Sequence, residues 1–294
     1  MIKRLIPLGL LLMIISAGAL AQSLPQRDLR IHTLESKIFN NTRKIRVLLP
    51  PHYEKKRRKE GYSVLYLNDG QNLFDEADAI FNKAEWKVDE TVTRLISDRI
   101  IGPIIVVGID NAGKKMRPNE YLPWEDEYLD PPMQNPQGSL YAEFLEKEVI
   151  PFIESKYRAR KKREARILGG SSYGALISLY SALKKPDLFG SLLLESPSFY
   201  VSDAKILAMA ESAEKLPLKV YLGVGTNEMG LKECGSDSDG GEAVSDIRRL
   251  GSILKRKGLA DGGLKVVVEK CAVHHEDAWA KRLPDALKFL FSTD

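Results

Sequence analysis

The chain alternates short apolar runs with longer stretches whose apolar residues recur every three or four positions. Residues 29–49 alternate apolar and polar positions around Asn40-Asn41, which predicts an antiparallel hairpin at a sheet edge. Apolar runs typical of buried strands follow at residues 62–67, 104–109, 167–168, 191–194, 218–224 and 264–268. Helical spacing is found in residues 86–96, 144–153 and 176–183, and helices are also expected after the later runs. This order predicts an α/β fold with a mostly parallel sheet and helices on both faces.

One long stretch, residues 112–137, interrupts this alternation. It is rich in proline, asparagine, tyrosine and charged residues, and it is expected to cross one end of the sheet. Loops of this length in compact domains are usually functional or disordered, and Tyr121 and Trp124 favour a functional loop. The sequence has no internal repeat and no sign of a second domain. Residues 22–294 are therefore expected to form one domain.

Composition and charge narrow the range of partners. Among 294 residues, 44% are hydrophobic and 29% are charged, which is ordinary for a globular protein with a substantial core. The net charge of +4 is small beside 44 basic and 40 acidic residues, so it indicates no polyanionic partner. Basic clusters at residues 55–59 and 158–163 lie in polar stretches, and we interpret them as solvated loops rather than as a nucleic-acid or membrane surface.

The first residues have the pattern of a secretory signal peptide. Lys3 and Arg4 precede an apolar stretch, residues 5–15, and Ala19-Leu20-Ala21 forms a cleavage site of small residues before Gln22. The apolar stretch is short for a membrane anchor, and no later stretch is long and apolar enough to span a bilayer. We expect removal of residues 1–21 and export of the mature chain to the periplasm or the medium, without stable membrane insertion.

The candidate nucleophile is Ser172, in the G-x-S-x-G sequence Gly170-Ser171-Ser172-Tyr173-Gly174. The motif lies between an expected strand and an expected helix, which is the context of a nucleophile elbow. The tight turn requires glycines on both sides of the serine, and shifting the frame to Ser171 would put Tyr173 where a glycine is needed. The alternative is a glycine-rich turn that contains an incidental serine.

Hydrolases built on such an elbow carry serine, acid and histidine in that order along the chain. Two of the four histidines, His32 and His52, precede the serine. His274 and His275 follow the last expected strand, where the general base belongs, and adjacent side chains cannot both face the serine. Glu228 is the first carboxylate after the preceding strand. Later carboxylates that could take its place are Asp237, Asp239 and Asp246.

Two backbone amides are expected to form an oxyanion hole. One belongs to Tyr173, directly after the nucleophile, and the other to the Gly70-Gln71 turn after the strand at residues 62–67, with Gln71 preferred. The sequence has no cluster with metal-ligand spacing, no P-loop and no dinucleotide-binding glycine signature. It therefore predicts neither a metal nor a cofactor.

The chain resembles the esterase D-like family of the α/β-hydrolase superfamily, and within it the branch of the enterobactin-type siderophore esterases. The resemblance covers nearly the whole mature chain. Its carriers are LYLNDGQNLFD at residues 65–75, VVGID at 106–110, RPNEYLPW at 117–124, GGSSYG at 169–174, ESPSF at 195–199 and HHEDAWAKRLP at 274–284. In the family's last motif the base is the histidine five residues before the tryptophan, which implies His274. Some members of this branch work largely as a Ser-His dyad, which leaves the role of Glu228 open.

The resemblance implies a secreted serine esterase that forms an acyl-enzyme on Ser172. It allows siderophore trilactones, acyl groups on polysaccharides and small aryl esters as substrates. The first alternative is a carbohydrate esterase that removes acetyl or feruloyl groups. The second is a non-catalytic exported binding protein on a hydrolase scaffold, against which the ordered serine, acid and histidine argue. Tyr121 and Trp124 are expected to form apolar walls of the substrate pocket. Arg117 is expected either to contact an anionic group of the substrate or to form an ion pair with Glu120.

The two cysteines, Cys234 and Cys271, follow the strands that precede the acid and the histidine. Those strand ends are neighbours in this fold class, and an exported protein can form disulfides. We expect a disulfide bond that ties the acid loop to the histidine loop. The alternative is a pair of free thiols.

Overall fold

The computed structural model describes residues 27–55, 58–127, 129–230, 234 and 240–292. The expected signal peptide, residues 1–21, therefore lies outside the described residues, as do Asp237 and Asp239.

Eight strands form one sheet in the order β1-β2-β4-β3-β5-β6-β7-β8. β1 pairs with β2, and β2 with β4, in antiparallel fashion, and every other neighbouring pair is parallel. The bounds are β1 Asp28–Ser36, β2 Asn41–Leu49, β3 Ser63–Asn68, β4 Ile104–Ile109, β5 Arg166–Ser171, β6 Ser191–Glu195, β7 Lys219–Gly225 and β8 Leu264–Glu269. The predicted mostly parallel sheet with an N-terminal antiparallel hairpin is confirmed.

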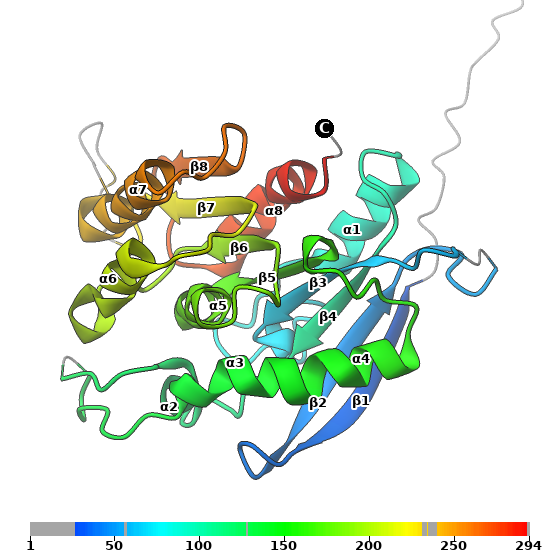
Figure 1. The fold of residues 1–294 in the computed structure, drawn as a ribbon, viewed down its shortest axis with the longest axis horizontal. Coiled ribbons are helices and arrows are strands. Elements are labelled where there is room, and N and C mark those ends of the chain that lie inside the picture. The colour runs from blue at the N-terminus through cyan, green and yellow to red at the C-terminus, as the bar shows by residue number, and fades with distance from the viewer. Residues whose placement is uncertain (1–26, 56–57, 128, 231–233, 235–239, 293–294) are drawn as a thin grey trace, which may run out of the picture.

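Helices cover both faces of the sheet (Figure 1). Their bounds are α1 Val88–Ser97, α2 Arg117–Tyr121, α3 Tyr141–Phe144, α4 Ile150–Lys156, α5 Tyr173–Lys184, α6 Lys205–Ser212, α7 Gly241–Arg256 and α8 Glu276–Phe291. The π-helical turn Leu145–Val149 joins α3 to α4. One apolar core lies under α3 to α7, and a second lies under α1 and α8. The predicted layers are therefore correct.

The carboxyl ends of the parallel strands lie at one edge of the sheet, and the turns that follow them carry the candidate site. β3 leads into the turn Gly70–Asn72, β5 into Ser172, β6 into Ser196, and β7 into Glu228. His274 follows β8 and precedes α8. Residues far apart in the sequence meet at this edge because parallel strands align their carboxyl ends.

Candidate active site

Ser172 occupies the turn between β5 and α5. Its backbone φ is 57°, a region that residues other than glycine seldom adopt, so the turn holds this serine in a strained conformation. A Cβ at position 174 would lie 2.9 Å from Oδ2 of Asp69, and one at position 170 would lie 2.9 Å from the carbonyl carbon of Gly174. Glycine is therefore required on both sides of Ser172, which is the physical basis of the G-x-S-x-G pattern.

The Ser172 hydroxyl stands at the amino end of α5 and faces open space. Its Oγ lies 3.2 Å from Oγ of Ser198, and its backbone N–H donates to the carbonyl of Glu195 at 3.0 Å. His274 and Ser172 together line two cavities, so the imidazole and the hydroxyl open onto the same space. Such pairs often tighten into a hydrogen bond only when substrate binds, and the arrangement suits a Ser-His pair.

A carboxylate holds the imidazole of His274. Nδ1 lies 2.7 Å from Oε2 of Glu228, whose Oε1 accepts the Gly225 N–H at 2.6 Å and the Ser196 hydroxyl at 2.8 Å. Burial alone would raise the pKa of Glu228, but the hydrogen bonds from His274, Gly225 and Ser196 lower it below its ordinary value. The ionised carboxylate favours the tautomer with Nδ1 as donor, which leaves Nε2 available for proton exchange.

Trp279 and Ser196, for which the sequence predicts no catalytic role, contact the His274–Glu228 pair and help to orient it. The indole N–H of Trp279 donates to the hydroxyl of Ser196 at 2.9 Å, and that hydroxyl donates to Glu228. The indole also packs edge-on against the His274 ring, with the ring centroids 5.2 Å apart. Both residues stand in motifs that carry the family resemblance, and that position was the only signal in the sequence.

Replacing Glu228 with glutamine should weaken catalysis without abolishing it. We expect Glu228→Gln to lower kcat/KM by roughly 10²- to 10⁴-fold, because the amide cannot orient and stabilise the imidazolium while nucleophile and base remain. Steady-state kinetics on a short aryl ester measure this loss. Asp246→Asn, a matched change on α7, should leave kcat/KM nearly unaltered. Full activity in Glu228→Gln would instead favour Asp237, Asp239 or a Ser-His dyad.

The expected oxyanion-hole amides belong to neighbouring turns. Asp69 has φ 59°, and the left-handed turn after β3 brings Gly70 close to β4, where a Cβ would lie 2.7 Å from the Gly108 carbonyl carbon. Within the described residues, no protein acceptor is found for the backbone amides of Gln71 and Tyr173. The Gln71 side chain is buried and accepts the N–H of Asn111 at 3.2 Å. The turn is thus anchored by its side chain, and the role of its amide stays a prediction.

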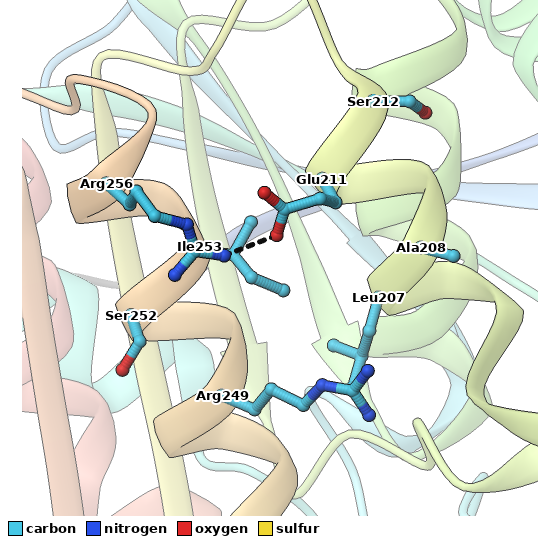
Figure 2. Close-up of a pocket in the computed structure, with 8 residues that line it drawn as sticks. All are labelled: Leu207, Ala208, Glu211, Ser212, Arg249, Ser252, Ile253 and Arg256. Atoms are coloured by element: carbon cyan, nitrogen blue, oxygen red, sulfur yellow. Dashed lines mark hydrogen bonds and ion pairs between the residues drawn. The ribbon is translucent and has the colours of Figure 1, made fainter.

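Two cavities flank Ser172 and His274. The larger, about 870 Å³, extends along Tyr173, Tyr200 and residues 226–229 to the first turn of α7. The smaller, about 250 Å³, lies between the turn after β3 and the start of α8. A third hollow of about 590 Å³ lies between α6 and α7, where Arg256 pairs with Glu211 (Figure 2). It contains none of the site residues, so the first two cavities are the candidate substrate site.

The chain matches a known protein family over most of its length. The sequence profile of the family described as "Putative esterase" matches residues 36–290. The chain belongs to this esterase family. The esterase is 28% identical to the siderophore triacetylfusarinine C esterase of Aspergillus fumigatus over 176 residues, which cover 57% of this chain and 55% of that relative.

Solved structures share the fold of this esterase. The IroE-like serine hydrolase from Shewanella oneidensis superposes with a TM-score of 0.69 at 21% identity, covering 91% of this chain and 82% of that one. A ferulic acid esterase superposes with a TM-score of 0.66 at 19% identity, covering 90% of this chain and 98% of that one. The predicted α/β-hydrolase fold and the predicted resemblance to siderophore esterases are confirmed.

The expected pocket walls in residues 112–137 require correction. Tyr121 is fully buried, and its ring packs edge-on against Tyr141, so it faces the core rather than a substrate. Trp124 packs edge-on against Tyr180, and neither residue lines the two cavities beside Ser172. The stretch contains the short helix α2, which ends at Tyr121 and places that ring in the apolar core.

Arg117 lines the smaller cavity, but its guanidinium is committed to Asp69 of the turn after β3. Nε and Nη2 each donate to this carboxylate at 2.8 Å, and Nη2 also lies 3.4 Å from the carbonyl of Ser171. The alternative pairing with Glu120 is wrong, since Glu120 pairs with Arg43. Arg117 thus ties the expected oxyanion turn to the end of β5.

Truncation of Arg117 should impair every ester to a similar degree. Arg117→Ala leaves the buried Asp69 carboxylate unpaired, which costs about 3–5 kcal/mol of stability and loosens the turn that carries Gln71. We expect equal fold losses in kcat/KM on matched neutral and anionic esters, measured where the variant remains folded by its thermal melt. A loss confined to the anionic ester would restore a direct recognition role for the guanidinium.

Cys234 and Cys271 form a disulfide bond, with Cα atoms 5.5 Å apart. The bond connects the loop after β7 to the segment that leads into His274. Backbone contacts support the same junction, because Thr226 donates its N–H to the Glu269 carbonyl at 2.9 Å and its hydroxyl accepts the Cys271 N–H at 2.9 Å. The acid loop and the histidine loop of this esterase are therefore joined by a covalent bond and by hydrogen bonds.

Reduction of this disulfide should lower thermal stability. It closes a segment spanning 37 residues, and the chain-entropy relation gives about 4 kcal/mol for a loop of that size. We expect a fall in Tm of roughly 8 °C or more with reductant, together with lower turnover from a looser His274 loop. The double variant Cys234→Ser/Cys271→Ser should melt at the reduced temperature with or without reductant. An unchanged melt on reduction would mean that the hydrogen bonds suffice.

The described residues contain no group of three or more His, Cys, Asp or Glu side chains arranged to hold a metal ion. No described helix combines the length and the apolar character needed to cross a membrane.

Proposed function

We propose that this esterase is an exported serine carboxylic-ester hydrolase that works through an acyl-enzyme on Ser172. The observation that carries the proposal is one connected arrangement. Ser172 stands on a strained turn at a helix amino end, and His274 opens onto the same cavities with its Nδ1 held by Glu228. A serine, a base and an orienting carboxylate in this arrangement suit acyl transfer.

In this mechanism Oγ of Ser172 attacks the ester carbonyl carbon while Nε2 of His274 takes the hydroxyl proton. The amides of Tyr173 and Gln71 stabilise the oxyanion, and the alcohol leaves with the proton from His274. Water then loses a proton to His274 and attacks the acyl carbon, which releases the acid and restores Ser172. Glu228 stays ionised and stabilises the imidazolium in both halves.

For the substrate we propose siderophore lactone esters. The similarity to a siderophore triacetylfusarinine C esterase supports this choice, and a cavity of about 870 Å³ has room for a bulky ester. A carbohydrate esterase that removes feruloyl or acetyl groups is the second candidate, favoured by the fold shared with a ferulic acid esterase.

Two measurements test the proposal. A short 4-nitrophenyl ester should give a burst of one nitrophenolate per active site, and a fluorophosphonate should label Ser172 as read by peptide mass. Absence of both would contradict the serine mechanism. Turnover of a siderophore trilactone is then compared with that of feruloylated and acetylated xylan, and faster release from xylan would favour the carbohydrate esterase.

Export is part of the proposal. The signal-like residues 1–21 and a disulfide bond both suit a chain that matures in an oxidising compartment. Fractionation of expressing bacterial cells should place the enzyme in the periplasm or the medium, with Gln22 as its first residue. Recovery of a chain that still begins at Met1 in the cytoplasm would contradict it.

A further inference from the structure

A second hydroxyl, that of Ser198, contacts the candidate nucleophile. Its Oγ lies 3.2 Å from Oγ of Ser172, and the backbone N–H of Ser198 donates to the Ser172 carbonyl at 3.4 Å. Ser198 lies in the loop after β6, is only 4% exposed and lines the larger cavity. Within the described part of the chain, its hydroxyl has Ser172 as its one hydrogen-bond partner. The hydroxyl is therefore placed to act on the reacting oxygen itself.

The loop after β6 holds Ser198 in place. Ser196 has φ 42° and donates its backbone N–H to a carbonyl of β7 at 2.7 Å, and Pro197 restricts the backbone between the two serines. One short loop thus presents the Ser196 hydroxyl to Glu228 and the Ser198 hydroxyl to Ser172. Because the loop is anchored in this way, the Ser198 hydroxyl requires little reorganisation when the reaction begins.

The chemistry decides which of the two hydroxyls donates. The proton of Ser172 has to reach Nε2 of His274, which is an acceptor while Nδ1 keeps its proton toward Glu228. Oγ of Ser172 then has two lone pairs, one for the ester carbonyl and one for a donor. In the reactive arrangement Ser198 is therefore the donor and Ser172 the acceptor.

We propose that Ser198 is a further catalytic residue, whose hydroxyl donates a hydrogen bond to Oγ of Ser172 and chiefly speeds deacylation. When the second tetrahedral intermediate breaks down, the bond between the acyl carbon and Oγ breaks. Oγ keeps the electron pair and takes the proton from Nε2 of His274, while Ser198 keeps its own proton. The inference rests on the proposed esterase function and adds a residue to it.

The effect on the two half-reactions differs. A hydrogen bond to an oxygen that gains negative charge is roughly twice as strong as one to a neutral oxygen, so it stabilises the departure of Oγ more than the acyl-enzyme. In acylation the same hydrogen bond eases the loss of the Ser172 proton but weakens Oγ as a nucleophile, so the two effects oppose each other. Loss of the Ser198 hydroxyl should therefore slow deacylation more than acylation.

Burst kinetics with 4-nitrophenyl butyrate test the proposal. In Ser198→Ala we expect kcat to fall by roughly 10- to 100-fold, while the rate constant of the nitrophenolate burst falls by less than about threefold. The butyryl-enzyme should then accumulate, which peptide mass detects as a butyryl group on Ser172. Phenyl butyrate should give the same kcat as the nitrophenyl ester, since both form the same acyl-enzyme. Ser198→Thr keeps a hydroxyl and should recover most of kcat.

Ser181→Ala is the matched control. Ser181 lies on α5 and is fully buried, and its hydroxyl has no hydrogen-bond partner among the residues that the structure describes. The variant removes the same group and should leave kcat and the burst as in the wild type. Thermal melts of all the variants show that each is folded under the assay conditions.

Three results would overturn the inference. One is an unchanged kcat in Ser198→Ala, and another is a higher kcat, which would mean that Ser198 holds the proton of Ser172 away from His274. The third is an equal loss of kcat in Ser198→Ala and Ser198→Thr, or an equal loss in burst and kcat, which would reduce Ser198 to a packing role. A wild-type enzyme without burst or turnover would instead contradict the esterase proposal itself.

Discussion

Ser172→Ala should abolish esterase activity while the protein keeps its fold. We expect kcat/KM on a short aryl ester to fall by roughly 10⁴- to 10⁶-fold, because no other group forms the acyl-enzyme. Stability should change little, since the lost hydroxyl contacts only Ser198 at 3.2 Å among the described residues. Thermal melts and the burst assay on purified variants measure both effects.

The strained turn gives this prediction a second readout. Ser172 has φ 57°, which glycine adopts without cost, so Ser172→Gly should be inactive and melt at a slightly higher temperature than the wild type. Ser171→Ala, one position earlier at the end of β5, should retain most activity. If Ser171→Ala were the inactive variant, the assignment of the motif frame would be wrong.

The strands and the nucleophile turn could be predicted because their signals are local. Runs such as residues 104–109 are apolar throughout, as expected for strands covered on both faces. The glycines around Ser172 report a steric requirement that any strand–turn–helix junction of this shape imposes. Parallel pairing then brings the ends of β3, β5, β6 and β7 to one edge without further information.

The hydrogen bonds and ion pairs that hold the site residues in place could not be predicted, because they join residues far apart in the sequence. The Trp279–Ser196 hydrogen bond spans 83 residues, and the Arg117–Asp69 pair spans 48. Likewise, the buried carboxylate of Glu276 accepts hydrogen bonds from Asn72 at 3.0 Å and from Asn82 at 2.8 Å. No periodicity or motif spacing specifies such partners. Polar and charged residues of these types are equally common at solvated positions, so their presence in the sequence does not predict that they are buried and paired.

Contacts between distant residues also explain why the predicted substrate pocket in residues 112–137 differs from the structure. The sequence predicts a pocket wall at Tyr121, and a substrate contact as one of two alternatives for Arg117, because aromatic and basic residues in a long loop suggest recognition. In the fold, α2 turns both inward, where the guanidinium stacks on the Tyr121 and Tyr173 rings at 5.1 and 5.4 Å. A charge-neutral, bidentate pair with Asp69 makes this burial tolerable. Sequence pattern alone cannot reveal such a partner.

Substitutions at the two adjacent histidines should have different effects, one on activity and the other on stability. His274→Ala is expected to lower kcat/KM by roughly 10⁴-fold or more, because it removes the base whose Nδ1 lies 2.7 Å from Glu228. Its melt is measured alongside, since Glu228 would lose one of the hydrogen bonds that keep its carboxylate ionised.

His275→Ala should instead act on stability. His275 is the N-cap of α8, and its Nδ1 accepts the N–H of Asp277 at 3.2 Å, so its side chain caps the helix instead of pairing with Glu228. Loss of an N-cap costs about 1 kcal/mol, which corresponds to a fall in Tm of roughly 3 °C, with kcat/KM within a few-fold of the wild type. His275→Asn, which keeps a capping acceptor, should recover most of that Tm. An inactive His275→Ala beside an active His274→Ala would reverse the assignment of the base and, with it, the role proposed for Glu228.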